Sequence, residues 1–487
     1  MQCPTATAAH PTGDGIKCQQ ISGGDGFATM ADGNQTYLFS FGPLSGLADI
    51  VQGKPGTQTA ATFNQDNTPL TSAMTANFLS GAPYPGYSFN GAIGLVPDPE
   101  STPTPNQLDG HVDPGLIMDI GVLNGSIPAP LMAIDEDDEF FLTLTNVGMI
   151  MRPDLFEQHT VHFHGYPNAS AFYDGVPDAS AAINIGGSFT YYYLAPDAGT
   201  YFWHCHITPP EHLQMGMVGQ LYVRPRQNHV NGDLYSALSA YETAPNGEVT
   251  GSSAYYERLR KHCTDDILCS NPLPAVNTGA ANDSTKKYAY NDGDGSTAYD
   301  VEYPIQMHGF DPNFHFVGMT FNPESFVSLK DKYFLLNGRS YPDTINPNPL
   351  STQASDGLPR FSQPLPSVIN IPAGKKALLR ISDLNVTEFH TLASLGIPMH
   401  VVGVNAKLLR DQDGNNMDYF TNSITLGGGE SIDVILDACK VRAADGSCTT
   451  PYAVGDTYYL YTPQLDHLSN DAENFGGMMT EVNIASN

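Results

Sequence analysis

The feature that most constrains this chain is a segment in which one cysteine stands between two histidines. His204-Cys205-His206 is followed closely by His212 and Met217. A thiolate, an imidazole and a thioether on one short segment can converge only where the chain turns a corner between strands. The segment therefore predicts the last loop-and-strand corner of a β-sandwich.

This segment and one earlier histidine match the ligands of a blue (type 1) copper. Such a site takes two imidazoles and a thiolate in a near-trigonal plane, with a weak axial thioether. The sequence predicts His159, Cys205, His212 and Met217 as these ligands, with His159 presented by an adjacent strand. Met215 is the alternative axial ligand, but the spacing of Met217 from His212 better places it at the start of the next strand. The competing interpretation is a buried structural cysteine with incidental histidines.

Four further imidazoles predict a second metal site. His162 and His164 alternate along the chain, so on a strand both point to one face. His204 and His206 flank Cys205 and point to the face opposite its thiolate. Two such pairs on neighbouring strands form a patch of neutral imidazoles, which suits copper. The Cys205 backbone would link the two sites as an electron route; the competing interpretation is a patch of solvent-facing histidines.

Short strand-like runs predict an all-β fold. The chain holds 47 Gly and 37 Pro, which favour tight turns between short strands. The expected strands are 36–41, 115–124, 139–146, 188–194 and 219–224, then 333–337, 367–371, 377–381, 399–402, 431–436 and 458–461. A short helix is expected near 234–260.

The length of 487 residues fits two to three domains. We expect an N-terminal extension over 1–30 and a copper-binding domain over 31–225. A linker with a loop and a short helix follows over 226–300. The second β domain covers 301–487 and is expected to lack a type 1 copper of its own.

The formal net charge is −30, from 51 acidic and 21 basic residues. Such a charge repels nucleic acid and anionic membranes and attracts cations, metal ions and basic redox proteins. The charge is also explained by solubility in a salty or extracellular setting. No apolar run approaches the length of a membrane span.

Six of the seven cysteines fall into pairs that are close in sequence. We expect disulfides between Cys3 and Cys18, Cys263 and Cys269, and Cys439 and Cys448, with Cys205 free. These disulfides indicate an oxidising compartment, extracellular or periplasmic, rather than reduced thiols in the cytosol. No signal peptide is visible at Met1, so the numbering is expected to begin after a removed leader.

Two acidic Gly loops, 291–296 and 411–416, carry the oxygen ligands that calcium prefers. Neither is followed by the bidentate Glu of a calcium loop, so solvated turns are expected there instead.

The sequence resembles the multicopper oxidase and copper nitrite reductase superfamily of cupredoxin proteins. The first-domain motifs are Leu123-Asn-Gly-Ser-Ile-Pro-Ala-Pro130, Asp174-Gly-Val-Pro177, 136–146 and 199–206, and the second-domain motifs are 334–338, 371–381, 395–403 and 426–435. The resemblance implies two cupredoxin-like Greek-key β-sandwich or barrel domains and the type 1 ligands named above. It also implies that His162, His164, His204 and His206 are half of the ligand set of a trinuclear oxygen-reducing cluster. Nitrite reductases carry an Asp where this chain has His162, so the match is to the oxidases.

The other half of that ligand set is missing from the chain. A trinuclear cluster takes four more histidines as His-x-His pairs from another copper-type domain. The histidines outside the first domain are all isolated: His229, His262, His308, His315, His390, His400 and His467. In one interpretation a neighbouring chain of a homo-oligomer, such as a trimer, completes the cluster with His308, His315, His400 or His467. In the others the chain is an electron carrier that uses only the blue copper, or a structural or surface-layer protein that keeps the copper fold.

As an oxidase, the chain would oxidise an electron donor at the blue copper. His212 is the expected point of electron transfer from the donor, because that imidazole edge usually faces solvent in such folds. Cys205 would then carry the electron to His204 and His206. The acidic surface favours cationic donors, and phenols, metal ions and protein partners all remain open.

Overall fold

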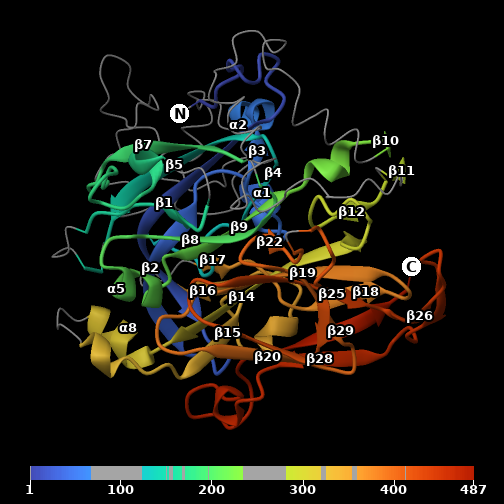
Figure 1. Ribbon diagram of the computed structural model, residues 1–487. Helices are drawn as coiled ribbons and strands as arrows, with labels where there is room; N and C mark the ends of the chain where they lie inside the picture. The colour runs from blue at the N-terminus through green and yellow to red at the C-terminus, as the bar shows by residue number, and fades with distance from the viewer. Residues whose placement is uncertain are drawn as a thin grey trace.

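The computed structural model shows two β-sandwich domains side by side (Figure 1). It describes residues 2–66, 123–149, 151–152, 157–166, 170–195, 197–233, 281–283, 285–319, 325–353, 359–411 and 413–486. Most of the expected strand 115–124, the helix expected near 234–260 and the Cys263–Cys269 pair lie outside these residues. Within them, no helix is long and apolar enough to cross a membrane.

The first domain consists of two sheets. One has the order β2-β1-β5-β7 with β3 added beside β1, and the other has the order β4-β9-β8-β6. Their bounds are β1 Ile16–Thr29, β2 Gln35–Pro43, β3 Gln58–Thr59, β4 Met132–Asp135, β5 Glu139–Gly148, β6 His162–His164, β7 Ser188–Leu194, β8 Gly199–His204 and β9 Val218–Arg224. Aromatic side chains from both sheets, among them Phe39, Phe140, Tyr191 and Trp203, are buried in one core.

The N-terminal residues correct one expected boundary. Residues 16–29 were expected in an extension, but they form β1, which pairs in parallel with β5 and antiparallel with β2. The sequence does not predict this strand, because glycines and polar residues interrupt the apolar pattern that is typical of strands. The glycines are needed because the backbone of another segment lies against the strand: a Cβ at Gly26 would lie 2.5 Å from the carbonyl oxygen of Gly125.

The second domain also consists of two main sheets. Their orders are β15-β14-β19-β25-β21-β22, with β23 beside β21, and β18-β29-β28-β20-β24. Their bounds are β14 Val301–Phe310, β15 Tyr333–Leu336, β18 Ile369–Pro372, β19 Lys376–Asp383, β20 His390–Leu395, β21 Met399–Val404, β22 Lys407–Leu408, β23 Tyr419–Thr421, β24 Ser423–Leu426, β25 Ser431–Asp437, β28 Thr457–Tyr461 and β29 Met479–Ala485. The core is mainly aliphatic. The all-β expectation is confirmed, and the strands predicted within the described residues are present.

Short strand pairs and helices complete the described structure. The short antiparallel strand pairs are β10 Gly232–Asp233 with β11 Ala281–Asn282, β12 Lys287–Tyr288 with β13 Ala298–Tyr299, β16 Leu350–Gln353 with β17 Pro359–Gln363, and β26 Cys439–Arg442 with β27 Cys448–Pro451. The α-helices are α1 Leu47–Ile50, α2 Ala60–Asp66, α5 Pro209–Gln214 and α8 Pro312–Met319.

The two domains repeat one strand arrangement. The parallel pair β1–β5 corresponds to β14–β19, and the parallel pair β4–β9 corresponds to β18–β29. The antiparallel succession β6–β8–β9 corresponds to β20–β28–β29. Positions in one domain can therefore be matched to the other through strand register.

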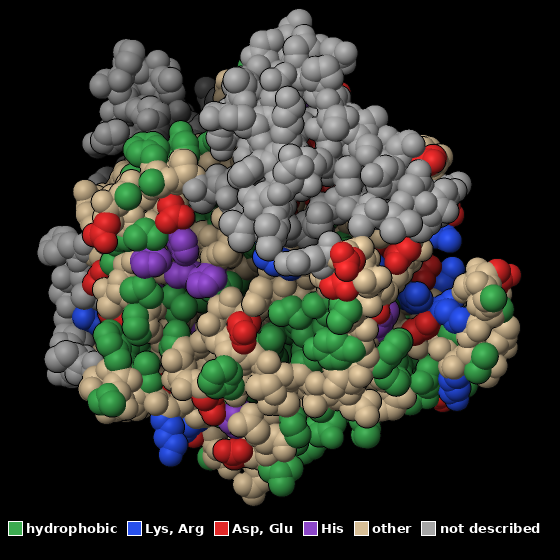
Figure 2. Space-filling model, viewed as in Figure 1, with side chains coloured by type: hydrophobic (Ala, Val, Ile, Leu, Met, Phe, Trp, Pro, Cys, Tyr) green, Lys and Arg blue, Asp and Glu red, His purple; other side chains and the backbone are tan. Residues whose placement is uncertain are grey.

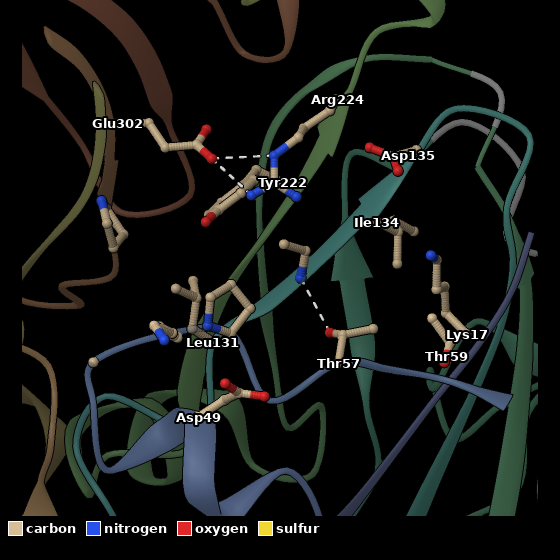
Figure 3. Close-up of a pocket in the computed structure, with 15 residues that line it drawn as sticks. Lys17, Asp49, Thr57, Thr59, Leu131, Ile134, Asp135, Tyr222, Arg224 and Glu302 are labelled. Carbon is tan, nitrogen blue, oxygen red and sulfur yellow. Dashed lines mark hydrogen bonds and ion pairs between the residues drawn. The ribbon is translucent and has the colours of Figure 1, made fainter. Parts of the chain in front are cut away.

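Buried polar contacts join the domains. Thr200 on β8 donates a hydrogen bond to Asp433 on β25 at 2.6 Å. Glu302 on β14 receives hydrogen bonds from Arg224 on β9 at 2.7 Å and from Arg380 on β19 at 3.2 Å. Figure 3 shows Glu302 facing Arg224 at the rim of an open cavity of about 490 Å³ between the domains. These contacts set the relative position of the two sandwiches.

The acidic loop at 291–296 is not the solvated turn that was expected. Asn291 and Asp292 are buried. The carboxylate of Asp292 accepts hydrogen bonds from Gln227 at 2.9 Å and from the backbone N–H of Gly295 and Thr297 at 2.8 Å each. Its oxygens therefore satisfy donors of the protein itself. The second loop, at Asp411, is exposed as expected.

Candidate metal centre

The cysteine lies at a tight corner between β8 and β9. β8 ends at His204, helix α5 fills the turn, and β9 begins at Val218. The Cys205 N–H donates to the Met217 carbonyl at 3.2 Å, and the Met217 N–H donates to the His212 carbonyl at 2.8 Å. These two bonds fold the loop back on itself and bring the predicted ligands together. Cys205, His212 and Met217 are fully buried.

His159 completes the cluster from outside this corner. An isolated bridge to Ile183 holds its backbone. Ligand atoms of His159, Cys205 and His212 all lie within 4.8 Å of one another. The His212 Nδ1 is 3.2 Å from the Cys205 Sγ, and the Thr160 backbone N–H donates to the same sulfur at 3.4 Å. The structure thus brings together the three strong ligands that the sequence predicted.

The chemistry of this cluster fits a metal ion. Both ring nitrogens of His159 and the Nε2 of His212 are buried without a hydrogen-bond partner in the described part of the chain, an arrangement that costs free energy unless a ligand is bound. Cys205 is free, whereas Cys3–Cys18 and Cys439–Cys448 form the expected disulfides. Burial alone would raise the pKa of Cys205, but His212 and His159 lower it well below its usual value. A thiolate beside imidazoles is the donor set of soft and borderline transition metals.

His212 does not face solvent as expected. Its side chain is fully buried. The Oε2 of Glu157 lies 3.7 Å from its Nε2, and the Glu157 side chain is 24% exposed. Burial would lower the pKa of His212, but the Cys205 thiolate and Glu157 raise it to about 9. Glu157, rather than the imidazole edge, is therefore the group at this position that meets solvent.

The four other histidines of these segments form one patch, defined here as the four-histidine patch: His162, His164, His204 and His206. β6 pairs with β8 so that His162 lies opposite His204. The ring centroid of His162 is 5.2 Å from that of His204 and 5.1 Å from that of His206. Figure 2 shows histidine side chains gathered at the surface over β8. The structure thus brings the two histidine pairs together.

Backbone carbonyls orient two rings of the patch. The Nδ1–H of His162 donates to the Asp174 carbonyl at 2.7 Å, and the Nδ1–H of His204 donates to the Cys205 carbonyl at 2.7 Å. In this tautomer each Nε2 keeps its lone pair for a ligand, which is the usual outer-shell arrangement of metal-binding histidines. Burial lowers the pKa of His204 to about 3 and also lowers that of His164. Both imidazoles are therefore neutral at physiological pH.

A glycine makes the Asp174 contact possible. Gly175 has a φ of 77°, and a Cβ there would lie 2.0 Å from the Val161 carbonyl oxygen. Any other residue would push the Asp174 turn away from β6. The Asp174-Gly-Val-Pro177 motif thus positions His162.

Known proteins are similar to this chain over the segment that contains both clusters. The family model "Multicopper oxidase" matches residues 111–228. The laccase abr2 of Aspergillus fumigatus is 32% identical over 174 residues, which are 33% of this chain and 28% of that protein. The multicopper oxidase MmcO of Mycobacterium tuberculosis is 34% identical over 106 residues, 22% of this chain and 19% of that protein. Residues 111–228 are thus similar to a domain of the multicopper oxidases.

A similarity of fold to a solved multicopper oxidase structure extends over both domains. The structure of the multicopper oxidase mgLAC aligns with 96% of this chain and 86% of its own, with a TM-score of 0.51 and 15% sequence identity. That identity supports the cupredoxin-like fold alone. This chain matches less than a third of the length of the curated relatives named above. The match of residues 111–228 to the multicopper oxidase model implies copper as the metal for such a domain.

The histidines suggested as interface ligands lie away from both clusters. His308 and His315 are buried within the chain, and each has a ring nitrogen at a backbone carbonyl: that of Leu384 for His308 and that of Gln214 for His315. His400 Nε2 is 2.9 Å from Asp418. His467 is buried beside Glu388. The structure therefore does not present His308, His315 or His467 on a surface where a neighbouring chain would meet them.

Sequence reasoning assigned no role to two residues that touch the clusters. Glu157 lies beside His212, and Asp174 holds His162. A signal for Asp174 was present, because its Gly-Val-Pro motif was part of the resemblance. Glu157 gives no such signal, since only the fold brings it to His212.

Proposed function

We propose that this chain is a copper-dependent oxidoreductase that accepts electrons at a type 1 copper. His159, Cys205 and His212 would hold the copper, with Met217 as axial ligand. The single observation that carries this proposal is the free, buried Cys205 beside the imidazoles of His159 and His212, with both ring nitrogens of His159 lacking a hydrogen-bond partner in the described structure. Copper bound there supplies one-electron redox chemistry.

Backbone geometry supports Met217 over Met215 as axial ligand. Both side chains are fully buried. Only Met217 is hydrogen-bonded through its backbone to Cys205, and its own N–H is bonded to His212. Met217 is thus directly tied to two of the other ligands.

The four-histidine patch would hold further copper. Cys205 is covalently joined to His204 and His206, so the protein provides a short through-bond connection between the two clusters. The His206 N–H also donates to Thr160 at 3.0 Å, and Thr160 in turn donates its N–H to the Cys205 sulfur. The partly exposed Glu157 beside His212 and the net charge of −30 favour cationic electron donors.

Oxygen reduction at a trinuclear cluster would take further histidines, and we propose that a second chain supplies them. The sequence contains no His-x-His pair besides those of the patch. We propose a homo-oligomer, such as a trimer, in which the patch lies at or near the interface. A blue-copper electron carrier is the second candidate, because one chain holds only half of a trinuclear ligand set. The disulfides support an extracellular or periplasmic location.

The patch provides the deciding experiment. The double substitution His162→Ala and His206→Ala should leave the visible band of the type 1 copper intact, lower the copper count per chain and abolish oxygen consumption with phenolic or metal-ion donors. His229→Ala is the matched control, since it removes an exposed histidine remote from both clusters. A monomer that holds one copper and consumes no oxygen with these donors would replace the oxidase by the electron carrier.

A further inference from the structure

The second domain contains a corner with the same backbone hydrogen bonds as the corner between β8 and β9 of the first domain, which carries Cys205. In the first domain, the Cys205 N–H donates to the Met217 carbonyl and the Met217 N–H to the His212 carbonyl. In the second, the Thr462 N–H donates to the Met478 carbonyl at 2.9 Å, and the Met478 N–H donates to the His467 carbonyl at 3.1 Å.

This match assigns three equivalent positions. Thr462 follows β28 as Cys205 follows β8, and Met478 precedes β29 as Met217 precedes β9. His467 then corresponds to His212.

Strand register assigns the fourth position. His162 lies opposite His204, the last residue of β8, and Ala393 lies opposite Tyr461, the last residue of β28. His159 precedes His162 by the same number of residues as His390 precedes Ala393. His390 therefore corresponds to His159, and three of the four predicted type 1 ligands recur in the second domain. Only the cysteine is replaced, by Thr462.

These side chains do converge, and a carboxylate joins them. Ligand atoms of Glu388, His390 and His467 all lie within 4.8 Å of one another. The Oε2 of Glu388 is 3.3 Å from the Nε2 of His467. The two imidazoles are buried, whereas the Glu388 side chain is 38% exposed. Phe334 stacks on the His467 ring at 3.8 Å between centroids and limits its rotation.

The surroundings of His390 match those of a metal ligand. Its Nδ1 is 3.4 Å from the Asp383 carboxylate, and its Nε2 accepts a hydrogen bond from the Asn385 amide at 3.2 Å. The proton thus lies on Nδ1, toward Asp383, and the lone pair of Nε2 accepts the Asn385 hydrogen bond, which a bound metal ion would replace. A carboxylate behind the far nitrogen of a histidine is the usual outer-shell support of a metal ligand. The Nδ1 of His467 is buried with no hydrogen-bond partner among the residues that the structure describes.

We propose that Glu388, His390 and His467 form a binding site for one divalent transition-metal ion at this second-domain corner, on the Nε2 side of His467. Two imidazoles and one carboxylate suit zinc or copper(II) and need no thiolate. Copper(II) bound there lacks a thiolate–metal charge-transfer band, so the site adds metal to the chain without adding blue colour. The Glu388 side chain is 38% exposed, so this ligand of the site is accessible from solvent.

Zinc binding to the full chain tests the site. Glu388→Gln removes the carboxylate ligand and keeps the side-chain shape at a partly exposed position. Asp466→Asn is the matched control, since it removes the same charge from an exposed residue next to His467. Titration of the metal-free protein with zinc should show one site weakened at least tenfold, or lost, in Glu388→Gln and retained in the control. Equal stoichiometry and affinities in the two variants would overturn the proposal.

A restored thiolate tests the correspondence between the domains. In a Cys205→Ser background, Thr462→Cys places a thiol at the position that matches Cys205. With copper(II) this double variant should regain an intense visible band that the Cys205→Ser parent lacks. Adding His390→Ala should remove the band again. A folded Cys205→Ser/Thr462→Cys protein, shown by circular dichroism, that binds copper without this band would refute the assigned geometry.

Discussion

Glu302 joins the two domains electrostatically, and its removal gives a quantitative prediction. Its carboxylate accepts hydrogen bonds from Arg224 at 2.7 Å, from Arg380 at 3.2 Å and from the Tyr299 hydroxyl at 3.0 Å. The Glu302 side chain is 12% exposed, and that of Arg380 is fully buried. Glu302→Gln keeps the size of the side chain but leaves two guanidinium groups close together with one fewer negative charge.

The pKa of Glu302 sets the expected magnitude. Burial alone would raise this pKa from 4.5, but Arg224 and Arg380 lower it to about 2. Such a shift corresponds to roughly 3 kcal/mol of stabilisation at neutral pH, close to the about 3–5 kcal/mol that the loss of one partner of a buried ion pair costs. Because the folded-state pKa is depressed, this stabilisation is fully present above pH 4.5 and is lost as the pH falls through about 2.

Chemical denaturation at several pH values measures the effect. The single tryptophan, Trp203, is buried in the first domain and reports unfolding by fluorescence. Glu302→Gln should lower the free energy of unfolding by about 3 kcal/mol at pH 7, and the difference from wild type should shrink steadily below pH 4.5. Glu473→Gln, at an exposed position, is the matched control. A loss no larger than that of the control, or one that does not change with pH, would refute the electrostatic explanation.

Three further outcomes follow from the first domain and the disulfides. Cys205→Ser should abolish the intense visible absorption of the copper-loaded protein; a persistent band would show that another residue supplies the thiolate. Met217→Leu should shift the reduction potential and the visible spectrum, whereas Met215→Leu should leave both nearly unchanged; the reverse result would make Met215 the axial ligand. Replacing Cys439 and Cys448 by Ser opens a loop with a sequence separation of 9. The free energy of unfolding should then fall by about 2–3 kcal/mol, while the visible absorption band stays unchanged. An unchanged free energy of unfolding would contradict a stabilising role of this disulfide.

The sequence alone determined the residues that build the first cluster and the patch. The predicted ligands can be recognised from short stretches of sequence. Cys205, His212 and Met217 share one corner, and alternation along a strand places His162 and His164 on one face. The strand pattern also predicted the two β domains, because side-chain alternation depends only on neighbouring residues. The same local pattern did not predict β1 at residues 16–29, because glycines and polar residues interrupt the apolar pattern of that strand.

The tertiary structure decided which groups surround these ligands. Glu157 lies beside the buried imidazole of His212 only because segments far apart in the sequence meet, so no local pattern predicted that contact. The site at Glu388, His390 and His467 was invisible for the same reason. Its two histidines are far apart in the sequence and become neighbours through the pairing of β20 with β28. No cysteine stands beside them, so no local motif indicates the site. Strand register across the sheet, which is set by long-range hydrogen bonds, is what brings them together.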